Sequence, residues 1–144
     1  MQSVTEAILV RVQQILVLAV LEVAGRVERG REDAYAIGEV PAINVRRGTG
    51  VLEPLGENGE VLRQAFELDI HVRGADWETQ ADAVHMSAHQ VLVGDLELYK
   101  LGRGLRLVAT DPSADKADST AGILTARYEI KAFVRPGNLA RNVN

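Results

Sequence analysis

The chain has 144 residues, of which 47% are hydrophobic and 25% charged, a composition typical of one folded domain and not of a disordered chain. It contains no cysteine, which excludes disulfides, thiolate metal sites and cysteine nucleophiles. The net charge of −4 excludes a sequence-wide basic surface for nucleic acid. Aromatic residues make up only 4% of the chain, which disfavours a base-stacking platform.

The first predicted element is an amphipathic helix. Ser3 and Glu6 match the S-x-x-E capping box, in which the two side chains satisfy backbone amides of the first turn. Apolar residues then recur at helical spacing as far as Val27. The apolar run 15–21 is too short to span a bilayer, and Glu22 follows it directly, so we expect neither a membrane span nor a signal peptide.

The apolar stripe of this helix is wider than a surface helix of a monomer needs, because Leu16 and Leu18 extend it beyond the main face. Two interpretations are open. The helix is either covered on most sides by its own domain, or it packs on its own sheet with one side and on a neighbouring subunit with the other. We favour the second interpretation and place Leu16 and Leu18 at a subunit contact.

Two strands follow the helix. The segment 41–47 alternates and is rich in β-branched residues, and the segment 61–73 has a clear period of two, with one apolar and one charged face. Between them, residues 48–60 contain four glycines and Pro54, which predicts a long loop. We expect an antiparallel pair with this overlong connection. Arg46, Arg47 and Arg63 lie close to the predicted loop, and we expect them to contribute to subunit contacts.

The second half of the chain has the same order of elements. Asp76 precedes a predicted helix that runs to about Val93, followed by strands at 105–110 and 123–134. Residues 111–122 between these strands predict a second long, acidic loop that contains Asp111, Asp115 and Asp118.

The element order is α-β-β-α-β-β, which predicts a two-layer α+β fold with a four-stranded antiparallel sheet and two helices on one of its faces. We assign residues 1–135 to a single domain and residues 136–144 to a flexible C-terminal tail.

Catalytic and metal-binding patterns are weak. His85 and His89 stand at i and i+4, as helical metal ligands do, but Met86 occupies the place of the zincin glutamate. The simpler interpretation is two solvated histidines. No nucleophile motif or phosphate loop is present, so we predict a protein that is not an enzyme and binds no cofactor and no metal.

The sequence resembles the tail terminator, or tail completion, proteins of long-tailed bacteriophages and prophages. The likeness covers nearly the whole chain in length and element order. It is closest in the segment 67–95, where a strand, a polar turn and a helix lead to Gly-Asp, and in the segment 105–135, which ends in an L-x-A-x-Y-x-I-x-A strand. The sequence differs from common members in its middle loop, 48–60, and in the extra tail after Phe133.

The resemblance implies a structural virion protein located in the tail and assembled in the host cytoplasm. Such proteins form a ring, typically a hexamer, that caps the tail-tube protein, stops tail polymerisation and offers a surface to the head-completion or connector protein. DNA would pass through the ring without specific binding, and we place the acidic loop residues Asp111, Asp115 and Asp118 at its lumen. The alternatives are another tail-tube or head–tail connector component, or a metal-binding protein that uses His85 and His89.

Overall fold

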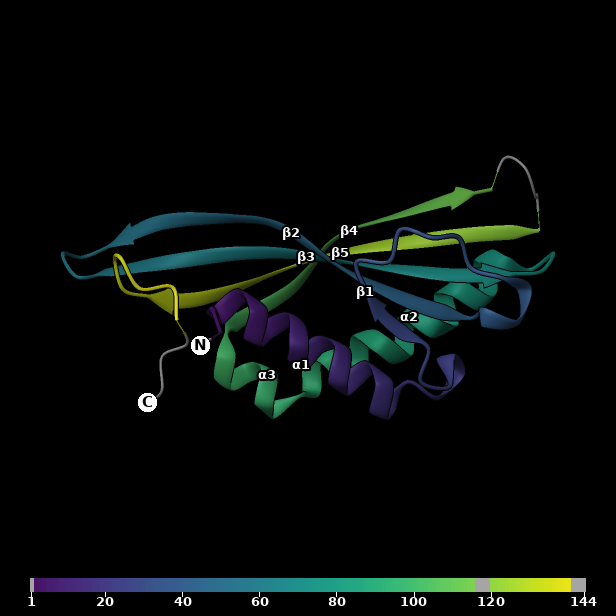
Figure 1. Cartoon of the computed structure of the whole chain (residues 1–144), viewed down its shortest axis with the longest axis horizontal. Helices are drawn as coiled ribbons and strands as arrows, with labels where there is room; N and C mark the ends of the chain where they lie inside the picture. Colours follow the sequence, from purple (N-terminus) through teal and green to yellow (C-terminus); the bar gives the residue numbers. More distant parts are fainter. Residues whose placement is uncertain (1, 116–119, 141–144) are drawn as a thin grey trace.

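A single sheet organises the fold of the computed structural model, which describes residues 2–115 and 120–140. The strand order is β1-β2-β3-β5-β4. The helices of the described residues all lie on one face of this sheet (Figure 1). The strands are β1 Val27–Arg29, β2 Ala42–Leu55, β3 Gly59–Arg73, β4 Arg103–Ala114 and β5 Ala121–Val134, and the helices are α1 Val4–Ala19, α2 Trp77–Gly94 and α3 Leu96–Leu101.

The α+β class is confirmed, but the expected sheet of four antiparallel strands is not. The additional strand β1 pairs with β2 in parallel, with Val27 opposite Ile43. The sequence pattern extended the first helix to Val27, whereas α1 ends at Ala19 and a short 3₁₀ helix follows. The positive φ angles of Ala24 (48°) and Gly25 (82°) then turn the chain back along the sheet.

The predicted loop 48–60 is instead a long hairpin. β2 and β3 stay paired from Gly50 opposite Gln64 to Leu55 opposite Gly59, after a register shift between Arg47 and Gly50. A Cβ at Gly48 would lie 3.0 Å from backbone atoms of Ala65 on β3. Glycine fits this position because the two strands approach closely, whereas the sequence pattern predicts a loop there. The hairpin extends beyond the helices at one end of the sheet (Figure 1).

The two ends of the second predicted loop, 111–122, belong to strands. β4 continues to Ala114 and β5 begins at Ala121, with Asp111 opposite Thr125. This edge strand is exposed along most of its length. The polar composition of residues 111–114 therefore reflects an edge strand and not an irregular loop.

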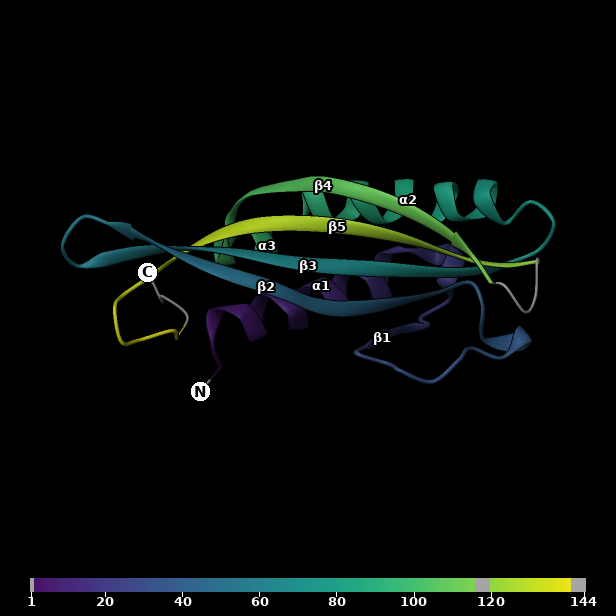
Figure 2. The same ribbon diagram turned by 90° about the horizontal axis from the view of Figure 1, so that it is seen from above.

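The core lies between the helices and one face of the sheet. Alternate residues of β3 and β5 are buried, as their period of two predicts, and Phe66 stacks on Tyr128 with ring centroids 5.4 Å apart. Figure 2 shows α2 toward the β4 edge and α1 toward the β2 edge. Ile8 and Leu9 of α1 are fully buried. Burial of such side chains, at about 25 cal/mol per Å² of apolar surface, holds the two layers together.

The chain segment after β5 returns to the start of α1. The Val4 amide donates to the Leu139 carbonyl at 2.9 Å, and Ser3 and Ala140 form a β-bridge. Within the segment 136–144, assigned to a flexible tail from the sequence, Leu139 and Ala140 are therefore held against the start of the N-terminal helix by backbone contacts. Residues 141–144 lie outside the described part of the chain.

Candidate functional site

The two leucines expected at a subunit contact have opposite environments. Leu16 is 0% exposed and belongs to the core, so it offers no surface to another chain, and the interface prediction is corrected at this position. Leu18 is 72% exposed, and Leu21 beyond it is 83% exposed. Together with Val17, these residues form an exposed apolar surface, which we call the α1 apolar end.

Arg46 belongs to a network of ion pairs on the face of the sheet away from the helices, the outer face. Its Nε donates to Asp69 Oδ2 and its Nη2 to Glu67 Oε2, both at 2.6 Å. Thr125 and Arg127 of β5 donate to the same carboxylates. The hydrogen bond to Asp69 raises the pKa of Arg46. Because these pairs are partly solvated, each contributes at most about 1 kcal/mol to folding.

The three arginines predicted at the contact do not share one face. Arg63 pairs with Glu53 on the outer face, with Nη2 2.6 Å from Oε1. Arg47 acts on the helix side, where the pKa of Glu6 is lowered first by its hydrogen bond to Arg29 and further by the charge of Arg47. Consecutive residues of a strand point to opposite faces, so Arg46 and Arg47 cannot serve the same flat surface.

The acidic residues expected at a lumen are only partly described. Asp111 lies within β4, opposite Thr125, and Asp115 follows the end of that strand. Both are exposed. Asp118 lies outside the described residues.

His85 of α2 is buried and His89 is half-buried, whereas the simpler interpretation of the sequence made both solvated. His85 Nε2 and His89 Nδ1 each lie 2.9 Å from the Tyr128 hydroxyl. His85 is 9% exposed, and its pKa is lowered by burial and then by the neighbouring His89. Burial raises the pKa of Tyr128. The three groups form a buried polar link between α2 and β5.

The described residues hold no cluster of three or more histidine, cysteine, aspartate or glutamate side chains that could bind a metal ion. His85 and His89 also direct their nitrogens to a tyrosine hydroxyl, which leaves one nitrogen of each ring for any ligand. Among the helices of the described residues, none is long and apolar enough to cross a membrane.

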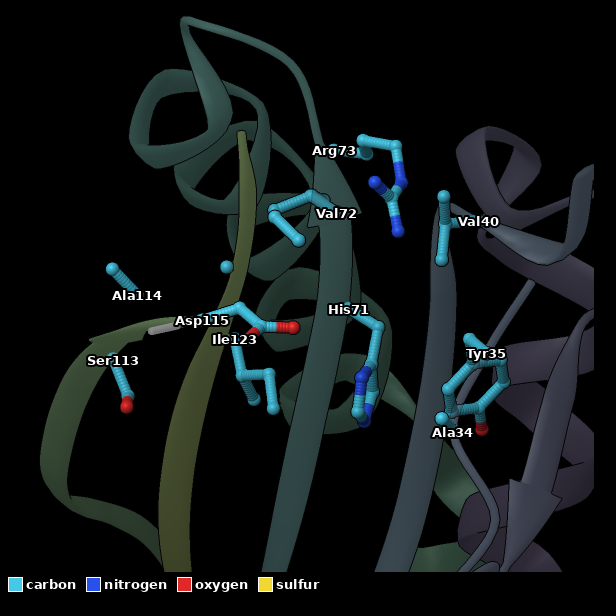
Figure 3. Close-up of a pocket in the computed structure, with 12 residues that line it drawn as sticks. Ala34, Tyr35, Val40, His71, Val72, Arg73, Ser113, Ala114, Asp115 and Ile123 are labelled. Carbon is cyan, nitrogen blue, oxygen red and sulfur yellow. The ribbon is translucent and has the colours of Figure 1, made fainter. Parts of the chain in front are cut away.

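A pocket of about 350 Å³ lies on the outer face, between the segment that precedes β2, the C-terminal end of β4 and the start of β5. Figure 3 shows the His71 ring facing Tyr35, with Arg73 toward the top of the view and Asp115 beside Ile123 on the other side of the strand that carries His71. The two ring centroids are 4.3 Å apart. Burial raises the pKa of Tyr35 to about 12 and lowers that of His71.

The segment that carries Tyr35 is held by a second arginine centre. Arg31 pairs with Glu39 and Glu28, and its guanidinium lies 4.0 Å from the centre of the Tyr35 ring. The bidentate contact lowers the pKa of Glu39 to about 2. These contacts hold the segment 31–39 together beside the outer face of the sheet.

Sequence reasoning missed the most exposed part of the sheet. β4 is paired on one side with β5, and along its other side the described residues provide no strand. Leu107 and Val108 of this strand are 36% and 42% exposed. The signal was the polar and small residues at 109–114, which are typical of an edge.

No protein-family model and no curated protein matched the sequence. Among solved structures, the chain is similar to a chain of the "Virion of native gene transfer agent (GTA) particle". The two are 18% identical with a TM-score of 0.57, over 85% of this chain and 92% of that one. The match shows a shared fold across almost the whole of both chains.

Proposed function

We propose that this chain is a non-enzymatic structural subunit of a phage-like particle. The observation that carries the proposal is the shared fold with a chain of a gene transfer agent virion, over 92% of that chain. Because the likeness includes both layers and not one motif, it relates the whole subunit and not a common substructure. A fold alone does not fix function, so the proposal also depends on surfaces that a monomer leaves unused.

Within such a particle, we propose the role of a tail terminator. In this role the chain forms a closed homo-oligomeric ring, with six subunits as in the family it resembles, on the last ring of tail-tube protein. The ring stops tube growth and presents its other side to the head-completion or connector protein. The protein would act in the virion tail after assembly in the host cytoplasm.

A ring requires a heterologous contact, in which two different patches of the subunit meet. We propose the α1 apolar end as one patch, because Leu18 and Leu21 are 72% and 83% exposed. Exposed apolar groups of this size gain free energy when a neighbour covers them. Arg46 and Arg63 of the outer face, or Arg47 on the helix side, supply polar contacts at the margin of the ring interface.

The lumen of the ring is the proposed path of DNA. Carboxylates along a channel repel phosphates and let the polymer slide, whereas a row of cations would hold it. Asp111 and Asp115 are exposed at one end of the sheet and are our candidates for this surface, with Asp118 between them and β5 in the chain.

The test is a polymerisation assay with the tail-tube protein of the same particle. We expect the purified chain to stop tube growth and to appear as a ring at one end of each tube in negative-stain images. Leu18→Asp should abolish capping, and Met86→Asp is the matched control, because Met86 is a 57% exposed apolar residue on a different helix. Open tubes formed by the chain itself would instead indicate a tube protein.

A further inference from the structure

The free edge of β4 is a second surface that the monomer leaves unsatisfied. β4 spans twelve residues, Arg103–Ala114, and pairs only with β5 within the described residues. The opposite edge of the sheet is partly covered by the three-residue strand β1. A long free edge presents unpaired backbone amides and carbonyls to any extended chain, and native proteins usually cover or pair such an edge.

A bulge in β4 decides which side chains share a face. Residues directly opposite in a sheet point to the same side. Arg106 is opposite Glu129 and pairs with it on the outer face at 3.1 Å, and Asp111 is opposite Thr125, also on the outer face. The register shifts between Leu107 and Ala109. A second shift lies between Arg103 and Arg106. Between the two shifts the outward positions of β4 are therefore even-numbered, and after residue 109 they are odd-numbered.

This pattern makes the strand complementary to itself. In an antiparallel pair of two β4 strands about a two-fold axis between residues 108 and 109, every opposed pair near the axis shares one face. The opposed pairs are Arg106 with Asp111, Leu107 with Thr110, and Val108 with Ala109. A shift by two residues in either direction sets an inward position against an outward one. An axis on Asp111 also matches the faces of residues 109–113, but it sets Asp111 opposite Asp111. The axis centred on the bulge instead brings Arg106 opposite Asp111 twice.

We propose that a second copy of this chain pairs with the free edge of β4, antiparallel and about this two-fold axis. Each copy then places its Arg106 opposite Asp111 of the other, and the two sheets continue into one another. The partner is a second copy of this chain, because the complementary charges of Arg106 and Asp111 lie on the same strand. Pro112 has no backbone N–H to donate, and it lies at the end of the paired segment. The central hydrogen bonds of the dimer are therefore made by residues 106–111.

This dimer is independent of the ring contact proposed above, which uses the α1 apolar end. It is a form of the free subunit in which the aggregation-prone edge is protected until assembly. Asp111 cannot line a lumen while it faces Arg106 of a second copy, so the dimer has to open before such a ring closes.

Charge exchange within one strand tests the proposal on the full chain. Arg106→Asp and Asp111→Arg each oppose like charges twice in the dimer, and each should raise the dimer dissociation constant about tenfold by sedimentation equilibrium at low salt. The double variant R106D/D111R restores opposite charges and should return affinity to near that of the unchanged chain. Lys100→Asp is the control, because Lys100 is an exposed cation on α3.

Amide hydrogen exchange measures directly whether the backbone amides of β4 become hydrogen-bonded in the dimer. Residues 106–111 should become more protected as protein concentration rises, with β5 unchanged. The proposal is overturned by a strict monomer at high micromolar concentration, by a dimer that the single reversals do not weaken, or by failure of the double variant to recover. A ring that forms with no added protection at 106–111 also overturns it, and leaves the ring proposal intact.

Discussion

The helix-covered middle of the sheet and its free margins follow different rules. In the middle, buried groups are satisfied within the chain: Phe66 stacks on Tyr128, and the Tyr128 hydroxyl lies between two histidines. At the margins, the α1 apolar end and the β4 edge carry exposed apolar side chains and unpaired backbone. The first region specifies the fold of one chain, and the second is suited to contacts between chains.

Leu16 and Leu18 are two residues apart in α1, but Leu16 belongs to the buried core and Leu18 to the exposed margin. Leu16→Asp buries a charge in the core and should reduce the free energy of unfolding by about 5 kcal/mol, enough to unfold a typical domain. Leu18→Asp should change it by less than about 0.5 kcal/mol while abolishing assembly. Urea unfolding measures both variants. Similar losses in the two would contradict the division.

A substitution at Gly122 tests how tightly α2 packs on the helix-covered middle of the sheet. A Cβ there would lie 2.2 Å from the Trp77 ring, far inside van der Waals contact. Gly122→Ala should therefore reduce the free energy of unfolding by about 3 kcal/mol, because either α2 or β5 has to move. The matched control is Gly94→Ala at the end of α2, where nothing lies within 4 Å of the added carbon. Equal effects in the two variants would argue against close packing of α2 on the sheet.

Asp95 joins α1 to α3 and has two roles, as an ion-pair partner and as a helix cap. Its carboxylate accepts two hydrogen bonds from Arg11 at 2.8 Å and caps α3 through the Leu98 amide at 3.0 Å. Asp95→Ala should cost about 2 kcal/mol in thermal unfolding, from both the cap and the ion pair. Asp95→Asn keeps a capping oxygen and should cost about half as much. An asparagine variant as unstable as the alanine variant would assign the whole effect to Arg11.

The smallest expected effect is a pH dependence. Burial lowers the pKa of His85 from its usual 6.5, so the unfolded chain binds the proton more readily than the folded one. Stability should fall as the pH drops from 6.5 toward the lower folded pKa, and His85→Gln should reduce that slope. Measurements above pH 4.5 avoid the carboxylates Glu6 and Glu39, whose lowered pKa values remove stability only at more acid pH. An unchanged slope in the variant would exclude His85 as its source.

Much of the middle could be predicted from sequence. The period of two in β3 and β5 identified their buried faces, and the spacing from Trp77 onward identified α2. These signals are local, because burial on one side imposes a fixed repeat. The hairpin between β2 and β3 was not predicted, because a glycine such as Gly48, which lets the two strands approach closely, looks the same in sequence as a loop glycine.

The candidate surfaces were less accessible to sequence reasoning. The helical repeat placed Leu16 and Leu18 on one broad stripe, but only the packing of α1 on the sheet shows that one is buried and the other is exposed. Likewise, the i,i+4 spacing of His85 and His89 could not reveal that Tyr128, about forty residues away, lies between them. Long-range contacts of this kind depend on the register of strands that are distant in sequence.

The most direct test of the proposed role is the position of the chain on a tail. Purified tails that carry an affinity-tagged copy, labelled with gold particles and viewed by electron microscopy, should show label at the head-proximal end alone. Label along the whole tube, or at neither end, would contradict the terminator account.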